Sequence, residues 1–129
     1  MAEATTAVVS HSQLSIGFEP TLRRELATRA TGRVLVIDYF ASRRCGVVTG
    51  DLTATFRHEI VGRYLELAPV DGVRIVAEER LLNLLQRSGP TLRLTGPNLW
   101  RHLSVELALP ELWLDFLERP GILRGKLWG

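Results

Sequence analysis

Cysteine is almost missing from this chain of 129 residues, which contains only Cys45. A single thiol cannot form an intrachain disulfide, and by itself it cannot supply a multi-thiolate metal site. The sequence also lacks the CxxC and HExxH spacings of metal sites, the Walker loop and the GxGxxG turn. The sequence therefore gives no indication of a metal site, a nucleotide-binding P-loop or a dinucleotide-binding turn. We predict no catalytic residue.

Long hydrophobic runs are absent too. No apolar stretch approaches the roughly 18 residues that a membrane-spanning helix needs, so no membrane span is expected. The first ten residues lack a basic segment followed by a long apolar core, which is the pattern of a secretory signal. With no disulfide framework either, the expected location is cytoplasmic.

Charge of one sign is scarce. Sixteen basic residues face fourteen acidic ones, which leaves a formal net charge of +2, and only Lys126 among the bases is lysine. Few aromatic residues accompany the arginines, so the sequence shows no nucleic-acid-binding surface. The length corresponds to one domain, and a protein partner or a second copy of the chain is the expected binding partner.

Apolar periodicity predicts helices and strands in alternation. A helix is expected from Pro20 to a stop at Thr31-Gly32, and a second over 78–87. The continuous apolar run 33–40 predicts a central strand buried on both faces, followed by a loop at 41–46. Further strands are expected at 51–57, 64–68, 73–77, 91–95 and 101–109, and 47–50 is either a short extended piece or part of the loop. Segment 111–117 fits either a last strand or a short helix.

This order predicts an α+β domain, with a mostly antiparallel sheet or a small distorted barrel and two helices. The predicted organisation is a flexible lead-in over 1–17, a single domain over 18–118, and a C-terminal tail over 119–129 that could form an interface.

Cys45 is the one candidate for a reactive atom. It follows Arg43 and Arg44, and neighbouring arginines favour the thiolate, which attacks electrophiles and binds soft metals. These three residues form a possible thiol or metal site, in which Cys45 is the only candidate ligand. The alternative is that Cys45 is a small buried hydrophobic residue, as most free cysteines are.

Other chemistry-bearing residues give weaker signals. Nothing in the spacing pairs His11, His58 or His102 with the cysteine, so we expect surface histidines. Asp38 interrupts the most apolar strand, and a carboxylate there must be paired or near solvent; we expect an ion pair with an arginine.

The three tryptophans fall in the last third of the chain, at 100, 113 and 128, and they suit either a core or an interface. For Trp128 we favour an interface, because a tail broken by proline and glycine is hard to bury in a small domain. The possible interface residues are Trp113, Leu127 and Trp128.

The stretches 33–38, 44–46 and 71–76, the last running into the leucines of 81–85, together resemble the HesB/IscA-like family of iron–sulfur carriers. The family shows a strand, a loop cysteine, further strands and a short leucine-containing helix in this order. The resemblance implies a HesB-like fold over about residues 20–118. The family's C-terminal Cys-x-Cys is missing here, so only Cys45 carries over as a cluster ligand.

Two functions compete. The first is a non-enzymatic accessory or interaction domain without a cofactor, acting as a homodimer or as a small subunit of a larger assembly. The alternative is a thiol- or metal-dependent protein centred on Cys45, either a redox sensor or a degenerate carrier whose iron–sulfur cluster is shared between subunits. A third hypothesis, an enzyme for an acidic small molecule, would use Arg43, Arg44 and an Asp38-lined pocket.

Overall fold

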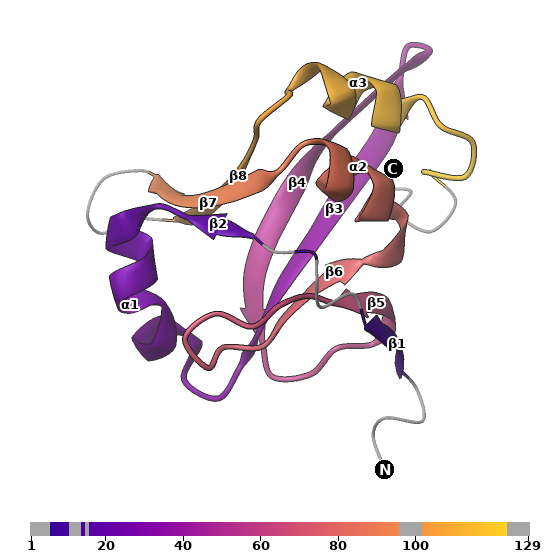
Figure 1. Cartoon of the computed structure of the whole chain (residues 1–129). Helices are drawn as coiled ribbons and strands as arrows, with labels where there is room; N and C mark the ends of the chain where they lie inside the picture. Colours follow the sequence, from indigo (N-terminus) through magenta and orange to yellow (C-terminus); the bar gives the residue numbers. More distant parts are fainter. Residues whose placement is uncertain (1–5, 11–13, 15, 96–101, 124–129) are drawn as a thin grey trace.

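The computed structural model describes residues 6–10, 14, 16–95 and 102–123, and it has an α+β fold (Figure 1). Within these residues there are three α-helices and one 3-10 helix, arranged with two mixed β-sheets. The elements are β1 Thr6–Ser10, β2 Gly17–Phe18, α1 Pro20–Ala30, β3 Val34–Arg44, β4 Val47–Arg57, β5 Gly62–Glu66, β6 Ile75–Glu78, η2 Glu79–Leu81, α2 Leu82–Arg87, β7 Pro90–Thr95, β8 His102–Leu107 and α3 Glu111–Leu117.

The strands form a five-stranded sheet in the order β1-β5-β6-β3-β4 and a three-stranded sheet in the order β2-β7-β8. β1 pairs with β5, β3 with β6 and β2 with β7 in parallel, while the other three pairings are antiparallel. Two parts of the prediction are therefore wrong. Both sheets are mixed rather than mostly antiparallel, and the described strands do not close into a barrel, because no ladder joins β4 to β8.

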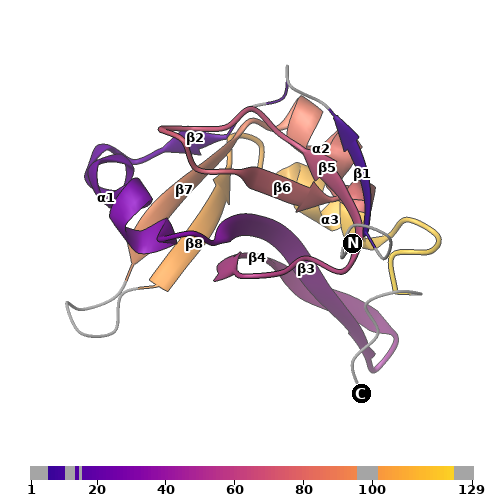
Figure 2. The same ribbon diagram turned by 90° about the horizontal axis from the view of Figure 1, so that it is seen from below.

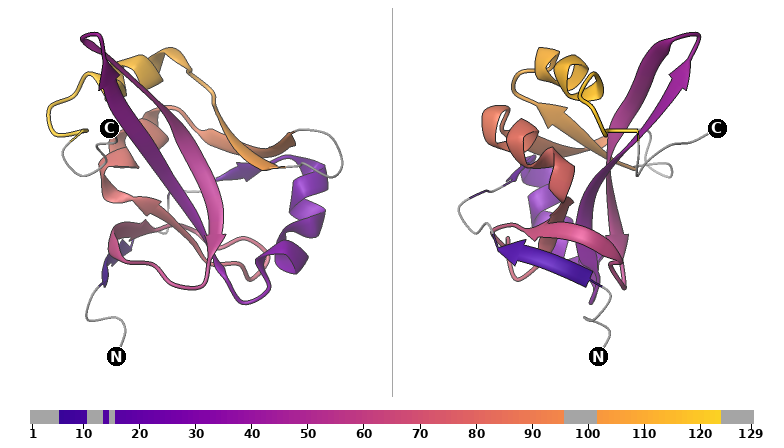
Figure 3. Two further views of the ribbon diagram at one scale, coloured as in Figure 1. Left: turned by 180° about the vertical axis from the view of Figure 1, so that it is seen from behind. Right: turned by 90° about the vertical axis from the view of Figure 1, so that its right-hand side faces the viewer.

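The longest feature is the β3–β4 hairpin, whose strands pair over eleven residues from Val34↔Arg57 to Arg44↔Val47. The predicted loop at 41–46 is thus mostly strand, and the turn contains only Cys45 and Gly46. Both have positive φ, 50° and 80°, as a two-residue type I′ turn requires. Its tip projects beyond the rest of the molecule in both views of Figure 3.

Helix α1 begins and ends where its sequence indicates. Pro20 opens α1, and Thr31, with φ of 42°, ends it in the left-handed conformation. The predicted helix at 78–87 divides into η2 and α2. Segment 111–117 is a helix rather than a strand, so the prediction of two α-helices was one short.

One hydrophobic core joins both sheets and all three helices. Alternate residues of β3, namely Leu35, Ile37, Tyr39 and Ala41, face it. α1 contributes Leu22 and Leu26, and α2, β7 and α3 add further buried side chains: Leu84, Leu85, Leu92, Phe116 and Leu117. A smaller cluster of Val36, Tyr64 and Val76 lies on the opposite face of the large sheet. β3 is therefore buried on both faces, as its apolar run predicts.

The two flanking segments contribute to this fold. β1, which lies in the predicted lead-in, pairs with β5 over five residues and is one edge of the large sheet. In the predicted tail, Ile122 is buried in the core, and its carbonyl accepts a hydrogen bond of 2.8 Å from the Tyr39 hydroxyl. Figure 2 shows β1 and β5 at one side of the molecule and β7 and β8 at the other. No helix among the described residues is long and apolar enough to cross a membrane.

Candidate functional site

The predicted thiol site lies at the tip of the β3–β4 hairpin. Cys45 is exposed, so the alternative of a small buried hydrophobic residue is wrong. Arg43 and Arg44 are exposed beside it, opposite Val48 and Val47 on β4. No group of three or more His, Cys, Asp or Glu side chains among the described residues could hold a metal ion. The tip therefore offers an accessible thiol between two strands.

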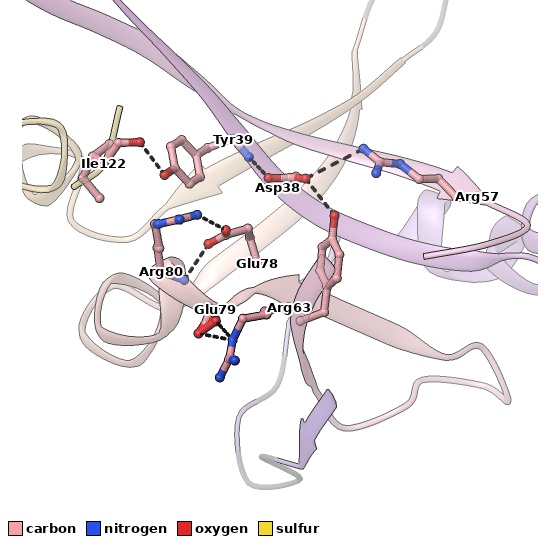
Figure 4. A network of polar contacts seen from close by, with 9 residues as sticks. Asp38, Tyr39, Arg57, Arg63, Glu78, Glu79, Arg80 and Ile122 are labelled. Atoms are coloured by element: carbon pink, nitrogen blue, oxygen red, sulfur yellow. Dashed lines mark hydrogen bonds and ion pairs between the residues drawn. The ribbon is translucent and has the colours of Figure 1, made fainter. Parts of the chain in front are cut away.

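A network of polar side chains lies farther from the hairpin tip, on β3 and β4 and on the neighbouring elements β5, β6 and η2 (Figure 4). Asp38 is only 4% exposed. Its Oδ1 accepts a hydrogen bond of 2.8 Å from the Tyr39 amide, and its Oδ2 accepts one of 3.1 Å from the Tyr64 hydroxyl. The Arg57 guanidinium lies 3.9 Å from the same Oδ2. The prediction that Asp38 pairs with an arginine is confirmed.

Glu78 is the second buried carboxylate, and it is 5% exposed at the end of β6. It accepts a hydrogen bond of 2.6 Å from the Arg80 amide, and the Arg80 side chain pairs with its other oxygen. Next to this pair, Arg63 pairs with Glu79. A pocket of about 290 Å³ opens here, lined by Val61, Gly62, Arg63, Tyr64, Glu78, Glu79 and Arg80.

Burial changes the acidity of both tyrosines in this region. Burial raises the pKa of Tyr64, and the negative charge of Asp38 raises it further. Burial raises the pKa of Tyr39 as well, with a second contribution from the charge of Glu78. Both phenols therefore stay protonated at neutral pH, where they act as hydrogen-bond donors.

The network fits a structural role. The arginines near the small pocket are matched by carboxylates, and every buried side-chain nitrogen or oxygen among the described residues has a hydrogen-bond partner. These contacts tie β3 to β4, β5 and the segment at Ile122. Arg43 and Arg44 do not take part in these contacts. They lie five and six residues from Asp38 along β3, roughly 17–20 Å away from it. The structure thus separates the residues of the predicted Asp38–arginine pocket.

A larger opening lies between β4 and β8, the strands at which the two sheets end. This groove has a volume of about 960 Å³. Its floor consists of side chains that also pack against the core: Leu52, Ala54, Leu103, Val105 and Leu107. Its rims carry the residues that alternate with these, namely Asp51, Thr53 and Thr55 on β4 and Ser104 and Glu106 on β8, together with Phe40 beside Asp51.

The pairing pattern shows where the main chain of β4 points. The Leu35 amide donates to the Arg74 carbonyl at 3.0 Å, so the polar backbone groups of Leu35 face away from β4. In an antiparallel pair this direction alternates, and the residue opposite has the same pairing state. Ile37 and Tyr39 are two and four residues from Leu35, so their main-chain groups also face away from β4. Their partners on β4 are Ala54 and Leu52, whose N–H and C=O groups therefore face away from β3 and point into the groove.

The main chain of β8 points into the same groove. The Glu19 amide donates to the Leu92 carbonyl at 2.9 Å, so Leu92 faces β2, and its partner Val105 faces away from β7. Among the described strands, no ladder partner covers these edges of β4 and β8. The groove therefore combines an apolar floor with two strand edges that no other described strand pairs with.

Trp113 closes one end of the groove. Its indole N–H donates to the Gly50 carbonyl at 3.1 Å, and its ring stacks on Phe116 at a centroid distance of 5.2 Å. This residue, predicted as core or interface, packs against the core and also lines the groove. Leu127 and Trp128, the other predicted interface residues, lie outside the described residues, as do His11 and Trp100.

Sequence reasoning missed the groove and half of the polar network. The sequence places Glu78 at the start of the helix predicted over 78–87 and Tyr64 at the start of the strand predicted over 64–68, and neither pattern indicates a buried polar contact. The signal that could have found the network is a lone polar group in an apolar strand, such as the Asp38 carboxylate or the Tyr64 hydroxyl. A buried polar group of this kind must find a hydrogen-bond partner in the fold. His58 is exposed, as expected for a surface histidine, and His102 begins β8. Comparison with protein-family models, with curated proteins and with solved structures gives no match to this chain.

Proposed function

We propose that this protein is a non-enzymatic interaction domain that binds an extended polypeptide segment in the groove between β4 and β8. It would act as a homodimer or as a small subunit of a larger assembly. The observation that supports this most directly is the coincidence of an apolar floor with two strand edges that point into one groove. An added strand satisfies such an edge through main-chain hydrogen bonds, and the apolar floor supplies affinity.

The buried polar network supports the same proposal. Its carboxylates and tyrosines bond to each other and to arginines of this chain, and the small pocket beside them has carboxylates matched to its arginines. These contacts hold β3 and β5 in place, so they position the hairpin that forms one wall of the groove.

Site-specific photo-crosslinking tests the proposal. A benzophenone amino acid replaces Thr53 on the groove rim in one variant, and Thr28, which is exposed on α1, in a control variant. Irradiation in the cells that make the protein should link one protein to position 53 and not to position 28, and mass spectrometry identifies it. A link to a second copy of this chain would show the homodimer, which light scattering then measures as mass.

The complex must also be rebuilt from purified components. Thr53→Arg, which places a long charged side chain on the rim, should weaken it at least tenfold, and Thr28→Arg should leave it unchanged. Equal crosslinking from positions 53 and 28, or equal affinity of the two arginine variants, contradicts the proposal.

A second candidate function rests on the exposure of Cys45 at a projecting hairpin tip. An accessible thiol between Arg44 and Gly46 suits a redox sensor, or one ligand of an iron–sulfur cluster shared by two subunits. Anaerobic purification with measurement of iron and of the visible spectrum tests the cluster. Iron that is lost in Cys45→Ser would support it, and iron-free protein whose thiol is inert to mild oxidants would exclude both forms.

A further inference from the structure

We infer that the groove binds an extended segment of a separate partner protein in which apolar residues alternate with arginine. In this arrangement the segment adds to the β4 edge, and one of its arginines lies on Phe40 and Asp51. This inference rests on the proposed function and adds the chemistry of the partner. It follows from the pattern of the floor and the rims, from the charge of the rims, and from the edges that this chain itself could offer.

The groove has two environments that alternate with the period of a strand. Residues such as Leu52 and Val105 give it an apolar floor, and the residues next to them along each strand reach the rims. A strand that adds to the β4 edge points every second side chain at the floor and the others outward, past the rims. An occupant that satisfies both environments alternates apolar with polar residues.

The charge on the rims selects the polar residues. The charged side chains that line the groove are Asp51 and Glu106, and no lysine or arginine lines it among the described residues. Glu106 is already paired with Arg93 at 2.8 Å. Asp51 is exposed and has no ion pair within the described part of the chain. A basic side chain of the occupant would therefore find its strongest contact at Asp51.

The neighbour of Asp51 favours arginine over lysine. Phe40 lies directly opposite Asp51 in the β3–β4 ladder, and at 41% exposed it is among the few large hydrophobic side chains open to solvent. A planar guanidinium can pair with the carboxylate while its face stacks on the ring, whereas an ammonium makes only the point-charge contact. The Phe40–Asp51 pair is thus a subsite for one arginine.

A second copy of the chain does not supply this pattern from its described edges. The edge strands are β1 and β4 of the large sheet and β2 and β8 of the small one. Their sequences are TAVVS, VVTGDLTATFR, GF and HLSVEL, and none alternates apolar residues with arginine. The described edges of a second copy therefore do not fit the groove, which leaves a separate partner protein.

The test uses the full-length protein and a probe peptide that carries fluorescein on its N-terminal amine, fluoresceinyl-Val-Arg-Val-Arg-Val-Arg-Val-amide, with binding followed by anisotropy. Replacing all arginines of the probe by glutamate should abolish binding, and replacing them by lysine should weaken it several-fold. In the protein, Asp51→Lys should weaken binding about fivefold to tenfold at low salt, which is the size expected for reversal of one exposed charge contact. Glu59→Lys, which makes the same charge change at an exposed site outside the groove, should have less than a twofold effect.

Two further probes carry N-methyl groups on their backbone amides. In one probe the valine amides are methylated, and in the other the arginine amides are. Because only every second amide of an added strand faces the β4 edge, one probe should lose binding and the other should keep it. Equal effects of the two methylated probes, or of Asp51→Lys and Glu59→Lys, would overturn the inference. The proposed function would survive that result if the crosslink from position 53 persists, so the two failures can be told apart.

The same assay identifies other occupants. A protein that ends at Leu123 and binds the probe more than tenfold tighter than the full chain would assign the groove to the chain's own C-terminal segment. A dimer that dissociates when the probe is added would assign it to a second copy. Either result would overturn the assignment to a separate partner, and equal affinity of a monomeric full chain and the shortened chain supports it.

Discussion

Gly50 shows how a single residue can limit the hairpin that forms the groove. A Cβ atom at this position would lie 2.1 Å from the Phe40 carbonyl oxygen and 2.9 Å from the Ala41 Cα, and both are backbone atoms that cannot move aside. Gly50→Ala should therefore lower the free energy of unfolding by about 2 kcal/mol, as overpacking does. Urea denaturation measures this change.

Gly89→Ala is the matched control for Gly50→Ala. A Cβ at Gly89 meets nothing within 4 Å, so this variant should unfold at the same urea concentration as the wild type, or slightly above it. An equal loss of stability in the two variants would mean that the close approach at Gly50 costs nothing. Gly50 also matters for the groove, because its carbonyl accepts the hydrogen bond from the Trp113 indole.

The two tyrosines predict how stability changes in alkali. Tyr39 and Tyr64 are the only tyrosines of the chain, and burial raises the pKa of both above the ordinary 10.0. When the folded pKa is raised, the contribution to stability is complete below pH 10.0 and is lost as the pH rises through the folded value. Denaturation at increasing pH should show this loss of stability. Phenolate absorbance should appear at a higher pH in the folded protein than in the protein unfolded in urea.

Tyr64→Phe separates the two phenols. This variant should lose about 1–2 kcal/mol at neutral pH, because Asp38 loses a hydrogen-bond donor. Above pH 10.0 its stability should fall less steeply than that of the wild type, since only Tyr39 remains to ionise. Identical alkaline curves for the two proteins would contradict the role of burial at Tyr64.

At the scale of single elements, the turn of the β3–β4 hairpin gives a prediction about Cys45. This residue has φ of 50°, a conformation that asparagine adopts readily and β-branched residues avoid. Cys45→Asn should raise the free energy of unfolding by about 0.5 kcal/mol, and Cys45→Val should lower it by about 1 kcal/mol. Thermal unfolding compares the three proteins, and equal stability of the two variants would show that the turn does not select its residues.

The same hairpin shows what the sequence can and cannot predict about elements. The apolar run 33–40 correctly predicts a strand buried on both faces. The sequence predicts a loop at 41–46, whereas the polar residues Ser42, Arg43 and Arg44 are the end of β3. Pairing with β4 keeps this polar segment extended, and that pairing is a long-range contact that local propensity does not contain.

Helix α3 shows a second limit. Leu112, Leu114 and Phe116 alternate as in a strand, but Leu114 is 64% exposed whereas Phe116 is buried. The contacts that decide are those of Phe116 with Trp113, three residues earlier, and of its ring with Tyr39 at 5.1 Å. Helical spacing therefore organises this segment, and only the position of Tyr39 in the fold determines which spacing buries more apolar surface.

At the scale of the whole molecule, the opening between the sheets could not be predicted. The sequence indicates the strands and the α+β class, and it allows a barrel. Closure depends on whether β4 and β8, which are far apart in the chain, come close enough to pair, and on the direction of their main-chain groups. Three parallel pairings set that geometry through crossover connections, and apolar alternation carries no information about them. The candidate site is therefore a property of the assembled sheets.

The direction of the main chain along β4 gives the last prediction, which hydrogen exchange measures one amide at a time. The amides of Asp51 and Thr53 point toward β3 and are paired, whereas those of Leu52 and Ala54 point into the groove. Exchange in the free protein should alternate along the strand, with Leu52 and Ala54 at least tenfold faster than their neighbours. Addition of the arginine probe should slow Leu52 and Ala54 and leave Asp51 and Thr53 unchanged, because an added strand bonds only to the open groups. Uniform protection along β4 in the free protein would mean that its edge is already covered, and the groove could not then bind a strand.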